Sequence, residues 1–302
     1  MPAESRLRAR LPTLRHRYSK GVRIVSLIAS ATEIVHALDL GKFQVGRSHE
    51  CDYPPSILTL PVCTEPVFDI HGDSRQIDQR VRETLATAES VYRVFDDVLE
   101  GLVPTHIITQ TQCRVCAVSL SDVERALGAK FSTGPKIVAL EPNSLGDIYR
   151  DILRIAQACE VEERGLELVA SMQSSMDGIA KIARAGGRSP RVLNMEWLEP
   201  MMVAGNWIPE LTGMLGATSV TGIEDDPDVI VCMPCGFDLK RTRAEMHWRD
   251  WSKLRARVYI ADANAYLTRP GPRVVESLRI LAEILYPESF EPSLQGIGWE
   301  PF

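Results

Sequence analysis

The residues SHECDYPP, at positions 48–55, place several chemically reactive side chains next to one another. They offer an imidazole, two carboxylates, a thiol and an aromatic ring from His49, Glu50, Asp52, Cys51 and Tyr53. Such a run is seldom part of a core, because each polar group would need a buried partner. Imidazole and thiolate bind zinc and iron, and carboxylates act as general bases or accept hydrogen bonds. The stretch predicts a site for metal binding or ligand recognition.

Cysteines supply a second group of reactive residues. Cys113 and Cys116 have the spacing of a zinc or redox pair. Cys232 and Cys235 repeat that spacing, but they lie far later in the chain, whereas a compact zinc ribbon needs about 15–20 residues between its pairs. Cys232 lies in the apolar run VIVCMP and is interpreted as a core residue. Seven cysteines, an odd number without an export signal, indicate free thiols in a reduced protein.

Short apolar runs that alternate with helical patterns must position these residues. In the first part of the chain, strands are predicted at 23–28, 43–47, 105–110 and 136–140, and helices at 31–38, at 74–89 and from Ser119 onward. Ser30 and Glu33 have the spacing of a capping box for the first helix. Because the order strand, helix, strand repeats without hairpin signals, it predicts a parallel sheet covered by helices.

The apolar spacing changes to three and four between Ser144 and Ala185, which predicts two helices divided near Glu160. The second of them would be about 35 Å long. Strands at 191–197, 229–234 and 256–262 then alternate with helices within 206–216, 238–248 and 274–286. The expected organisation is a basic tail over 1–22, an α/β lobe over 23–143, linking helices over 144–186 and a second α/β lobe over 187–302.

The carboxyl ends of parallel strands are where open sheets bind ligands. Helical connections return the chain to the same edge each time, and the two edges can face each other. We therefore expect one site between the lobes. Its candidate ligand-binding residues are His49, Glu50, Cys51, Asp52, Tyr53, Gln112, Glu196, Trp197, Phe237, Asn264 and Tyr266. Its candidate metal ligands are Cys51, Cys113, Cys116 and His49.

Charge, hydrophobicity and the absence of known motifs exclude several classes of function. The net charge is −6, and the first 22 residues hold six basic side chains against one acidic, so nucleic-acid binding is not indicated for the remainder. The absence of an apolar run of about 18 residues predicts no membrane span. The tail lacks the apolar segment of a secretory signal, so we expect a cytoplasmic protein, or a periplasmic one if the start codon is misassigned. Motifs for a phosphate loop, a nucleophile elbow or a dinucleotide fold are absent.

Several segments together resemble the cobalamin-binding, BtuF-like branch of the substrate-binding proteins of ABC transporters. They are RIVSLIASATEIVHALDLG, GRSHECDYP, CRVCAV, PCGFDL and DANAYLTRPGPRVVESLRILAEIL. The resemblance extends over about residues 23–290 and implies the helical-backbone, class III periplasmic-binding-protein fold, with two Rossmann-like lobes on one rigid helix. It also implies a corrinoid, haem or siderophore between the lobes and an ABC permease that docks on acidic surface residues. The missing signal peptide and lipobox cysteine and the cysteine-rich cleft suggest a signal-less sub-branch. The short stretch between Val220 and Val229 suggests that the first crossover of the second lobe is trimmed.

Two functions remain open at this point, and a scaffold that has lost its ligand is a third alternative. In the first, a binding protein without catalysis, the flat faces and edges of a chelate contact Trp197, Tyr53, Phe237 and Tyr266. Its amide protons are accepted by Glu50, Asp52, Gln112 and Asn264, and its metal is reached by His49 or Cys51. In the second, a metalloprotein or enzyme, Cys51, Cys113, Cys116 and His49 bind zinc or an iron–sulfur cluster, and Glu50 is a general base.

Overall fold

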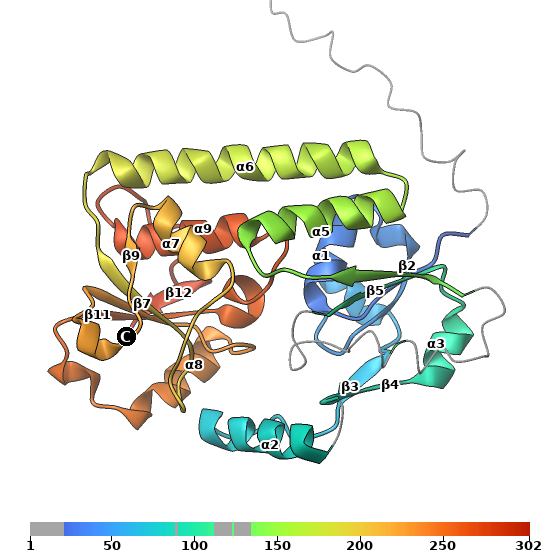
Figure 1. Cartoon of the computed structure of the whole chain (residues 1–302), viewed down its shortest axis with the longest axis horizontal. Helices are drawn as coiled ribbons and strands as arrows, with labels where there is room; N and C mark the ends of the chain where they lie inside the picture. The colour runs from blue at the N-terminus through green and yellow to red at the C-terminus, as the bar shows by residue number, and fades with distance from the viewer. Residues whose placement is uncertain (1–20, 88–89, 112–122, 124–133) are drawn as a thin grey trace, which may run out of the picture.

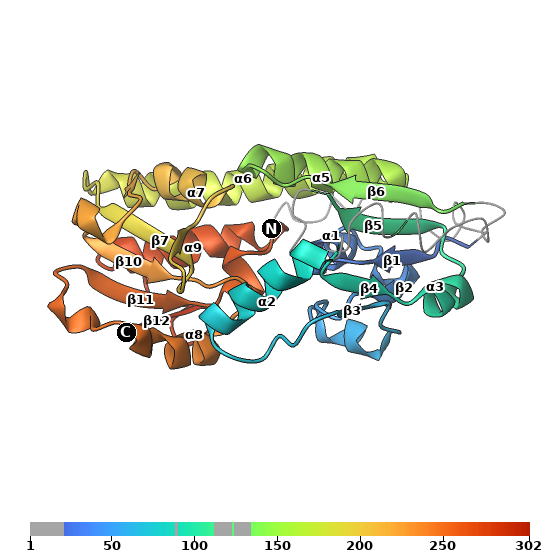
Figure 2. The same cartoon turned by 60° about the horizontal axis from the view of Figure 1, so that its bottom comes forward.

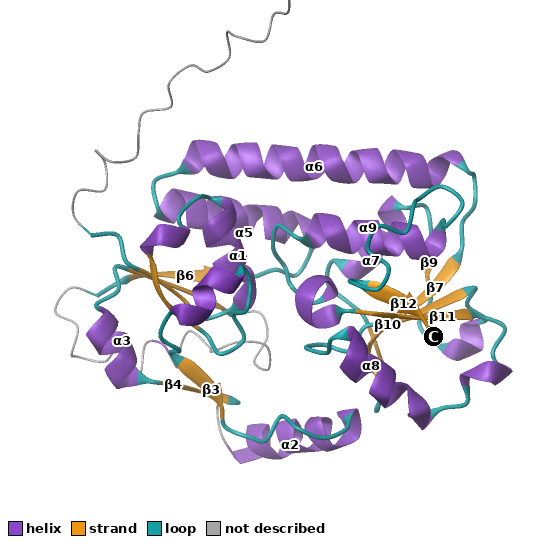
Figure 3. Cartoon of the chain, turned by 180° about the vertical axis from the view of Figure 1, so that it is seen from behind, coloured by secondary structure: helices purple, strands orange, loops and turns teal. Residues whose placement is uncertain are grey.

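The computed structural model describes residues 21–87, 90–111, 123 and 134–302. Two α/β lobes lie side by side under one long helix, α6 (Glu162–Ala185), which spans both of them (Figure 1). α6 packs on α5 (Leu145–Ala158), above the first lobe, and on α9 (Val274–Leu285) of the second lobe. These helices form a layer on one side of both sheets (Figure 3). The predicted α/β class and backbone helix are confirmed.

The first lobe is built on a four-stranded parallel sheet with the order β2-β1-β5-β6. Its strands are β1 (Ile24–Ser26), β2 (Gln44–Arg47), β5 (His106–Gln110) and β6 (Lys136–Leu140), and its helices are α1 (Ala29–Ala37), α2 (Ser74–Thr87) and α3 (Asp96–Leu102). A small antiparallel pair, β3 (Thr64–Pro66) and β4 (Tyr92–Val94), stands beside the sheet. Gly46 lets β2 approach its neighbours, since an added Cβ would lie 2.9 Å from the Cys63 sulfur.

The second lobe has a six-stranded sheet with the order β12-β11-β10-β7-β8, and β9 pairs with β7. Its strands are β7 (Arg191–Trp197), β8 (Met202–Val203), β9 (Thr218–Ser219), β10 (Val229–Cys232), β11 (Arg257–Ala261) and β12 (Trp299–Pro301), and its further helices are α7 (Ile208–Met214) and α8 (Leu239–Glu245). The central strands are parallel, as predicted, but the edge strands β8 and β12 are antiparallel. Strands of two or three residues are too short to show an alternating pattern.

One hydrophobic core runs through both lobes. The same cluster of buried side chains includes Ile24 of the first lobe, Met172 and Met176 of α6, and Val192 and Leu281 of the second lobe. The turn between α5 and α6 is tight, because a Cβ at Gly165 would lie 2.6 Å from that of Ala156. This shared core fixes the lobes relative to each other, because any rotation would disturb close packing on α6.

The predicted capping box at the start of α1 is not formed. The helix begins at Ala29, its cap is Ile28, and no side chain bonds to the cap. Ser30 therefore lies within the first turn, where its hydroxyl cannot cap. Glu33 is buried and points to the second lobe, where it pairs with arginines.

Candidate functional site

The loop after β2 carries the first group of reactive residues, and hydrogen bonds give it a defined shape. The Cys51 N–H donates to the Ser48 carbonyl at 3.2 Å. The Arg47 guanidinium donates to the carbonyls of Ser48 at 3.1 Å and Cys51 at 3.2 Å. Since β2 runs parallel to β1, the loop emerges at the carboxyl edge of the sheet. Asp52 and Tyr53 are held there, and the Tyr53 residue is 45% exposed.

His49 is a neutral imidazole in this loop. Its Nδ1 lies 2.9 Å from the Thr64 hydroxyl, and its ring centroid is 5.2 Å from that of Tyr92. Burial, and then the charge of Arg47, lower the pKa of His49 to about 4. At neutral pH the ring therefore carries no charge, and Nε2 is the nitrogen left for another group. A neutral imidazole can coordinate a metal without first losing a proton.

Cys51, in contrast to Tyr53, is buried. The residue is 1% exposed, its sulfur accepts a hydrogen bond from the Thr32 hydroxyl at 3.1 Å, and it lies 3.8 Å from the Ser26 carbonyl. Burial raises the pKa of the Cys51 thiol to about 11, so the thiolate that a metal needs is disfavoured. Gln112, Cys113 and Cys116 lie outside the described residues.

Within residues 21–87, 90–111, 123 and 134–302, no three His, Cys, Asp or Glu side chains are placed to hold a metal ion. Cys232 is fully buried in the second sheet, as predicted for a core residue, and Cys235 is an exposed free thiol. Because Cys113 and Cys116 lie outside the described residues, the predicted zinc or iron–sulfur centre stays a prediction.

The second lobe contributes a cluster of aromatic side chains at the carboxyl ends of β7 and β10. The rings of Trp197 and Phe237 meet edge to face with centroids 5.4 Å apart. The Arg241 guanidinium lies 3.9 Å from the centroid of the Phe237 ring, which is only 2% exposed. Burial raises the pKa of the nearby Glu196 carboxyl, which accepts the Gly205 N–H at 3.4 Å. Two of the four predicted stacking residues, Trp197 and Phe237, are thus together, and the Arg241 guanidinium covers the Phe237 ring.

Asp52 and Asn264 meet across the lobes, although 212 positions separate them in the chain. The Asn264 amide donates to the Asp52 carboxylate at 3.2 Å. Arg269 makes two bonds to the same carboxylate, at 2.5 and 2.9 Å, and donates to the Asn264 oxygen at 3.2 Å. Loops at the two sheet edges therefore come within contact of each other.

Glu33 extends these contacts into an ion network, defined here as Glu33, Asp52, Arg269 and Arg273. Its centre, the contacts of Glu33 with the two arginines, is buried, and the Asp52 side chain is 46% exposed. Arg273 donates to both Glu33 oxygens, at 2.8 and 2.6 Å, and Arg269 donates to one of them at 3.1 Å. The Arg273 guanidinium also lies 4.1 Å from the Tyr53 ring centroid and 5.1 Å from that of Tyr266. Two carboxylates and two guanidiniums balance, so the network is neutral and joins the lobes beneath α6.

A second set of contacts joins the lobes on the side away from α6 (Figure 1, Figure 2). The Trp197 indole donates to the Ser74 carbonyl at 3.2 Å, and the Ser74 N–H donates to Glu245 at 3.0 Å. Arg75 pairs with Glu199, and Arg241 donates to the Ile70 carbonyl at 2.9 Å. The start of α2 is thereby attached to the second lobe.

Several residues that form bonds between the lobes were not predicted from the sequence. Glu33, Arg273, Ser74, Arg75 and Glu245 were not among the candidates. A signal existed for the arginines, because Arg269 and Arg273 lie four positions apart in the loop that leads into α9, and two neighbouring charges of one sign require acceptors. No local pattern marks the acceptors, because these belong to the other lobe.

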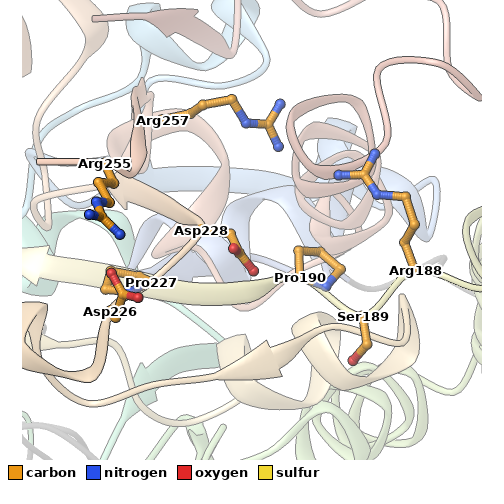
Figure 4. A pocket seen from close by; sticks show the side chains of 8 residues that line it. All are labelled: Arg188, Ser189, Pro190, Asp226, Pro227, Asp228, Arg255 and Arg257. Atoms are coloured by element: carbon orange, nitrogen blue, oxygen red, sulfur yellow. The ribbon is translucent and has the colours of Figure 1, made fainter.

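Two surface hollows lie away from these loops, with volumes of about 540 and 430 Å³. The first is at the amino ends of β7, β10 and β11, the edge opposite the candidate site (Figure 4). Its lining carries charges of both signs: Arg188 pairs with Glu288 at 2.7 Å, and Asp228 accepts the backbone N–H of Arg191 at 2.8 Å. This mixed lining gives no preference for a ligand charge.

Two Rossmann-like lobes under one backbone helix define the class III periplasmic-binding-protein fold. The structure is similar to the periplasmic haem-binding protein RhuT of Roseiflexus sp. RS-1 in apo form (TM-score 0.64, 20% identity, 90% of this chain and 100% of that chain covered). It is also similar to a periplasmic haem-binding protein of Pseudomonas aeruginosa (0.66, 17%, 92% and 97%) and to the periplasmic vitamin B12 binding protein BtuF of Vibrio cholerae (0.61, 19%, 89% and 98%).

A relative found by sequence comparison is described as the same class of protein. The chain is 24% identical over 291 residues to YvrC of Bacillus subtilis (strain 168), described as an uncharacterized ABC transporter substrate-binding lipoprotein. The alignment covers 89% of this chain and 81% of that protein. No family model matches the chain. The resemblance to substrate-binding proteins of ABC transporters is therefore confirmed.

The expected cytoplasmic location is wrong. The similar proteins are described as periplasmic or as a lipoprotein, and these act outside the cytoplasm. The expectation rested on the missing signal pattern at the first residues, which is weaker than similarity along most of the chain. Among the helices that the structure describes, none has the length and hydrophobicity to cross a membrane.

Proposed function

We propose that the protein binds a flat metal chelate between its lobes and delivers it to an ABC permease. The observation that carries the proposal is the meeting of sheet-edge loops from both lobes, seen in the bond between Asn264 and Asp52. Aromatic side chains from both lobes flank this region, and such rings suit the faces of a macrocycle. The similar RhuT and BtuF proteins are described as binding haem and vitamin B12.

Within this class, the charges favour a corrinoid, which carries amides, over haem, which carries carboxylates. Glu50 and Glu196 lie at the candidate site, and their oxygens can accept amide N–H groups. The arginines nearby already have acceptors: Arg269 and Arg273 pair with carboxylates, and Arg241 donates to backbone carbonyls. A ligand carboxylate would have to displace one of these acceptors.

His49 is the proposed axial ligand of the bound metal. Thr64 occupies Nδ1, so Nε2 is the nitrogen directed to a new partner. The lowered pKa keeps the ring neutral at neutral pH, and Nε2 carries no proton in the tautomer in which the Nδ1–H donates to Thr64. Cys51 is a poorer candidate, because its thiol is buried among Thr32 and Ser26.

Optical titration of the purified protein tests whether it binds a metal chelate and whether it prefers a chelate with amides to one with carboxylates. The probes are cyanocobinamide, aquocobalamin, iron protoporphyrin IX and its diamide, in which amides replace both propionates. We expect binding of at least one chelate at about micromolar concentration, and tighter binding of the diamide than of the parent haem by about ten-fold. His49→Ala should remove the spectral shift of the metal.

Two results would count against it. If no probe binds below about 1 mM, which is only about −4 kcal/mol, chelate binding is refuted. If haem binds more tightly than its diamide, the preference for amides is refuted while chelate binding stands.

A further inference from the structure

The segment 67–87, called the strap below, leaves the first lobe and returns to it. It runs from the end of β3 toward the second lobe, turns at Ser74, and comes back as α2 (Figure 2). Of the fourteen residues of α2, only Ser74 and Ile77 are buried. Val67 and Ile70 are exposed by 49% and 41%. Such a segment has little core of its own, so its position depends on contacts at its tip.

The tip contacts fall on the aromatic residues of the candidate site. Trp197 donates to the Ser74 carbonyl, and Arg241, which covers the Phe237 ring, donates to the carbonyls of Ile70 and Gly72. The strap thus binds the Trp197 indole N–H directly and holds the guanidinium that covers the Phe237 ring. A ligand that stacks on Trp197 or Phe237 would have to separate the strap from the second lobe.

The two attachments between the lobes differ in burial. In the ion network, the side chains of Arg269, Arg273 and Glu33 are 7%, 14% and 3% exposed, so the pairs that Glu33 makes are buried, while the side chain of Asp52 is 46% exposed. In the strap, the Arg75 side chain is 70% exposed and its partner Glu199 is 33% exposed. Water screens the second pair and supplies replacement hydrogen bonds, so the strap separates far more readily than the network.

We propose that the strap is the gate of the inter-lobe site: it detaches from the second lobe to admit a ligand, while the ion network keeps the lobes in place. This inference rests on the proposed function for its purpose, but the motion itself can be measured without ligand. In this opening step, Ser74 and Arg75 separate from their partners Trp197, Glu199 and Glu245, and the lobes do not rotate.

Hydrogen–deuterium exchange of the full, ligand-free chain tests the motion. Arg75→Glu places two carboxylates together, and it should speed exchange about five-fold or more in peptides covering 67–77 and 196–202, with no change in 263–274. The charge swap Arg75→Glu/Glu199→Arg should restore protection. Arg82→Glu is the matched control, because Arg82 is on the same helix, 66% exposed, and pairs only with Asp78 within α2 among the described contacts.

Equal exchange in Arg75→Glu and Arg82→Glu, or failure of the swap to restore protection, would overturn the gate. Faster exchange in 263–274 as well would mean that the lobes open as a whole, and would also overturn it. With cyanocobinamide as probe, Arg75→Glu should raise the association and dissociation rate constants by a similar factor. If exchange behaves as expected but cyanocobinamide and haem fail to bind, the gate stands and the proposed function fails.

Discussion

Glu33→Gln is the sharpest test of the ion network. The substitution keeps the shape of the side chain and removes its charge. Glu33 is 4% exposed and accepts three hydrogen bonds from Arg269 and Arg273, at 2.6 to 3.1 Å. Without its charge, the two guanidiniums share only the carboxylate of Asp52. A buried positive charge is left without compensation.

Removing one partner of a buried ion pair costs about 3–5 kcal/mol. The lower end applies here, because Asp52 still neutralises Arg269 and the glutamine oxygen still accepts one hydrogen bond. We therefore expect a loss of about 3 kcal/mol in the free energy of unfolding. With a urea m-value of about 3 kcal/mol/M, the midpoint should fall by about 1 M.

Urea unfolding followed by far-UV circular dichroism measures this loss. Glu167→Gln is the control, because it makes the same change on the exposed side of α6. The double variant Glu33→Gln/Arg273→Met should cost less than the sum of the single variants by about 1 kcal/mol or more, because it removes the uncompensated charge. A loss below about 1 kcal/mol for Glu33→Gln would refute the reasoning.

Three further predictions concern pH and the site carboxyls. Burial alone would raise the pKa of Asp52, but the bonds and charge of Arg269 hold it below its usual 3.8. Its pairing with Arg269 therefore stabilises the folded protein above that pH, and urea titrations should show that the deficit of Asp52→Asn shrinks as the pH falls below 3.8. Burial lowers the pKa of His49 from 6.5 to about 4, so the unfolded chain binds more protons in that window. The free energy of unfolding should therefore decrease as the pH falls from 6.5 to about 4. In His49→Gln this decrease should be smaller by about 1 kcal/mol, a figure reduced to allow for the partial exposure of the ring. Burial raises the pKa of Glu196, so its ionised form costs stability above that pKa. Glu196→Gln should stabilise the chain at pH 7 by urea unfolding and weaken cyanocobinamide binding about ten-fold.

Much of the scaffold could be predicted, because its long elements carry strong local patterns. β6 and β7 match the predicted residues, since their apolar runs are bounded by turn signals, and the helix break falls at Glu160. The edge strand β12 could not be predicted. It is only three residues long, and it is anchored by tertiary contacts, among them the Trp299 indole donating to Glu283 at 2.8 Å.

The candidate site was predictable in part for the same reason. Strand ends indicate which loops share an edge, and this rule brings Asp52 to Asn264. It does not indicate how a charge is paired. Glu33 follows Ser30 by three residues, so its local pattern predicts a cap, whereas its partners Arg269 and Arg273 lie more than 200 residues later. Cys51 likewise turns inward, because Thr32 and Ser26 satisfy its thiol.

A site between lobes has to keep its shape and still admit a ligand. The ion network serves the first requirement and the strap serves the second. Rotation of the lobes would break the packing of α6 on α5 and α9 and separate buried charges at the same time. Each of these costs several kcal/mol, because close-packed cores and buried ion pairs do not yield gradually. Release of the strap breaks hydrogen bonds and one largely exposed ion pair, which water can replace. The low-cost motion is therefore also the one that uncovers Trp197 and Phe237.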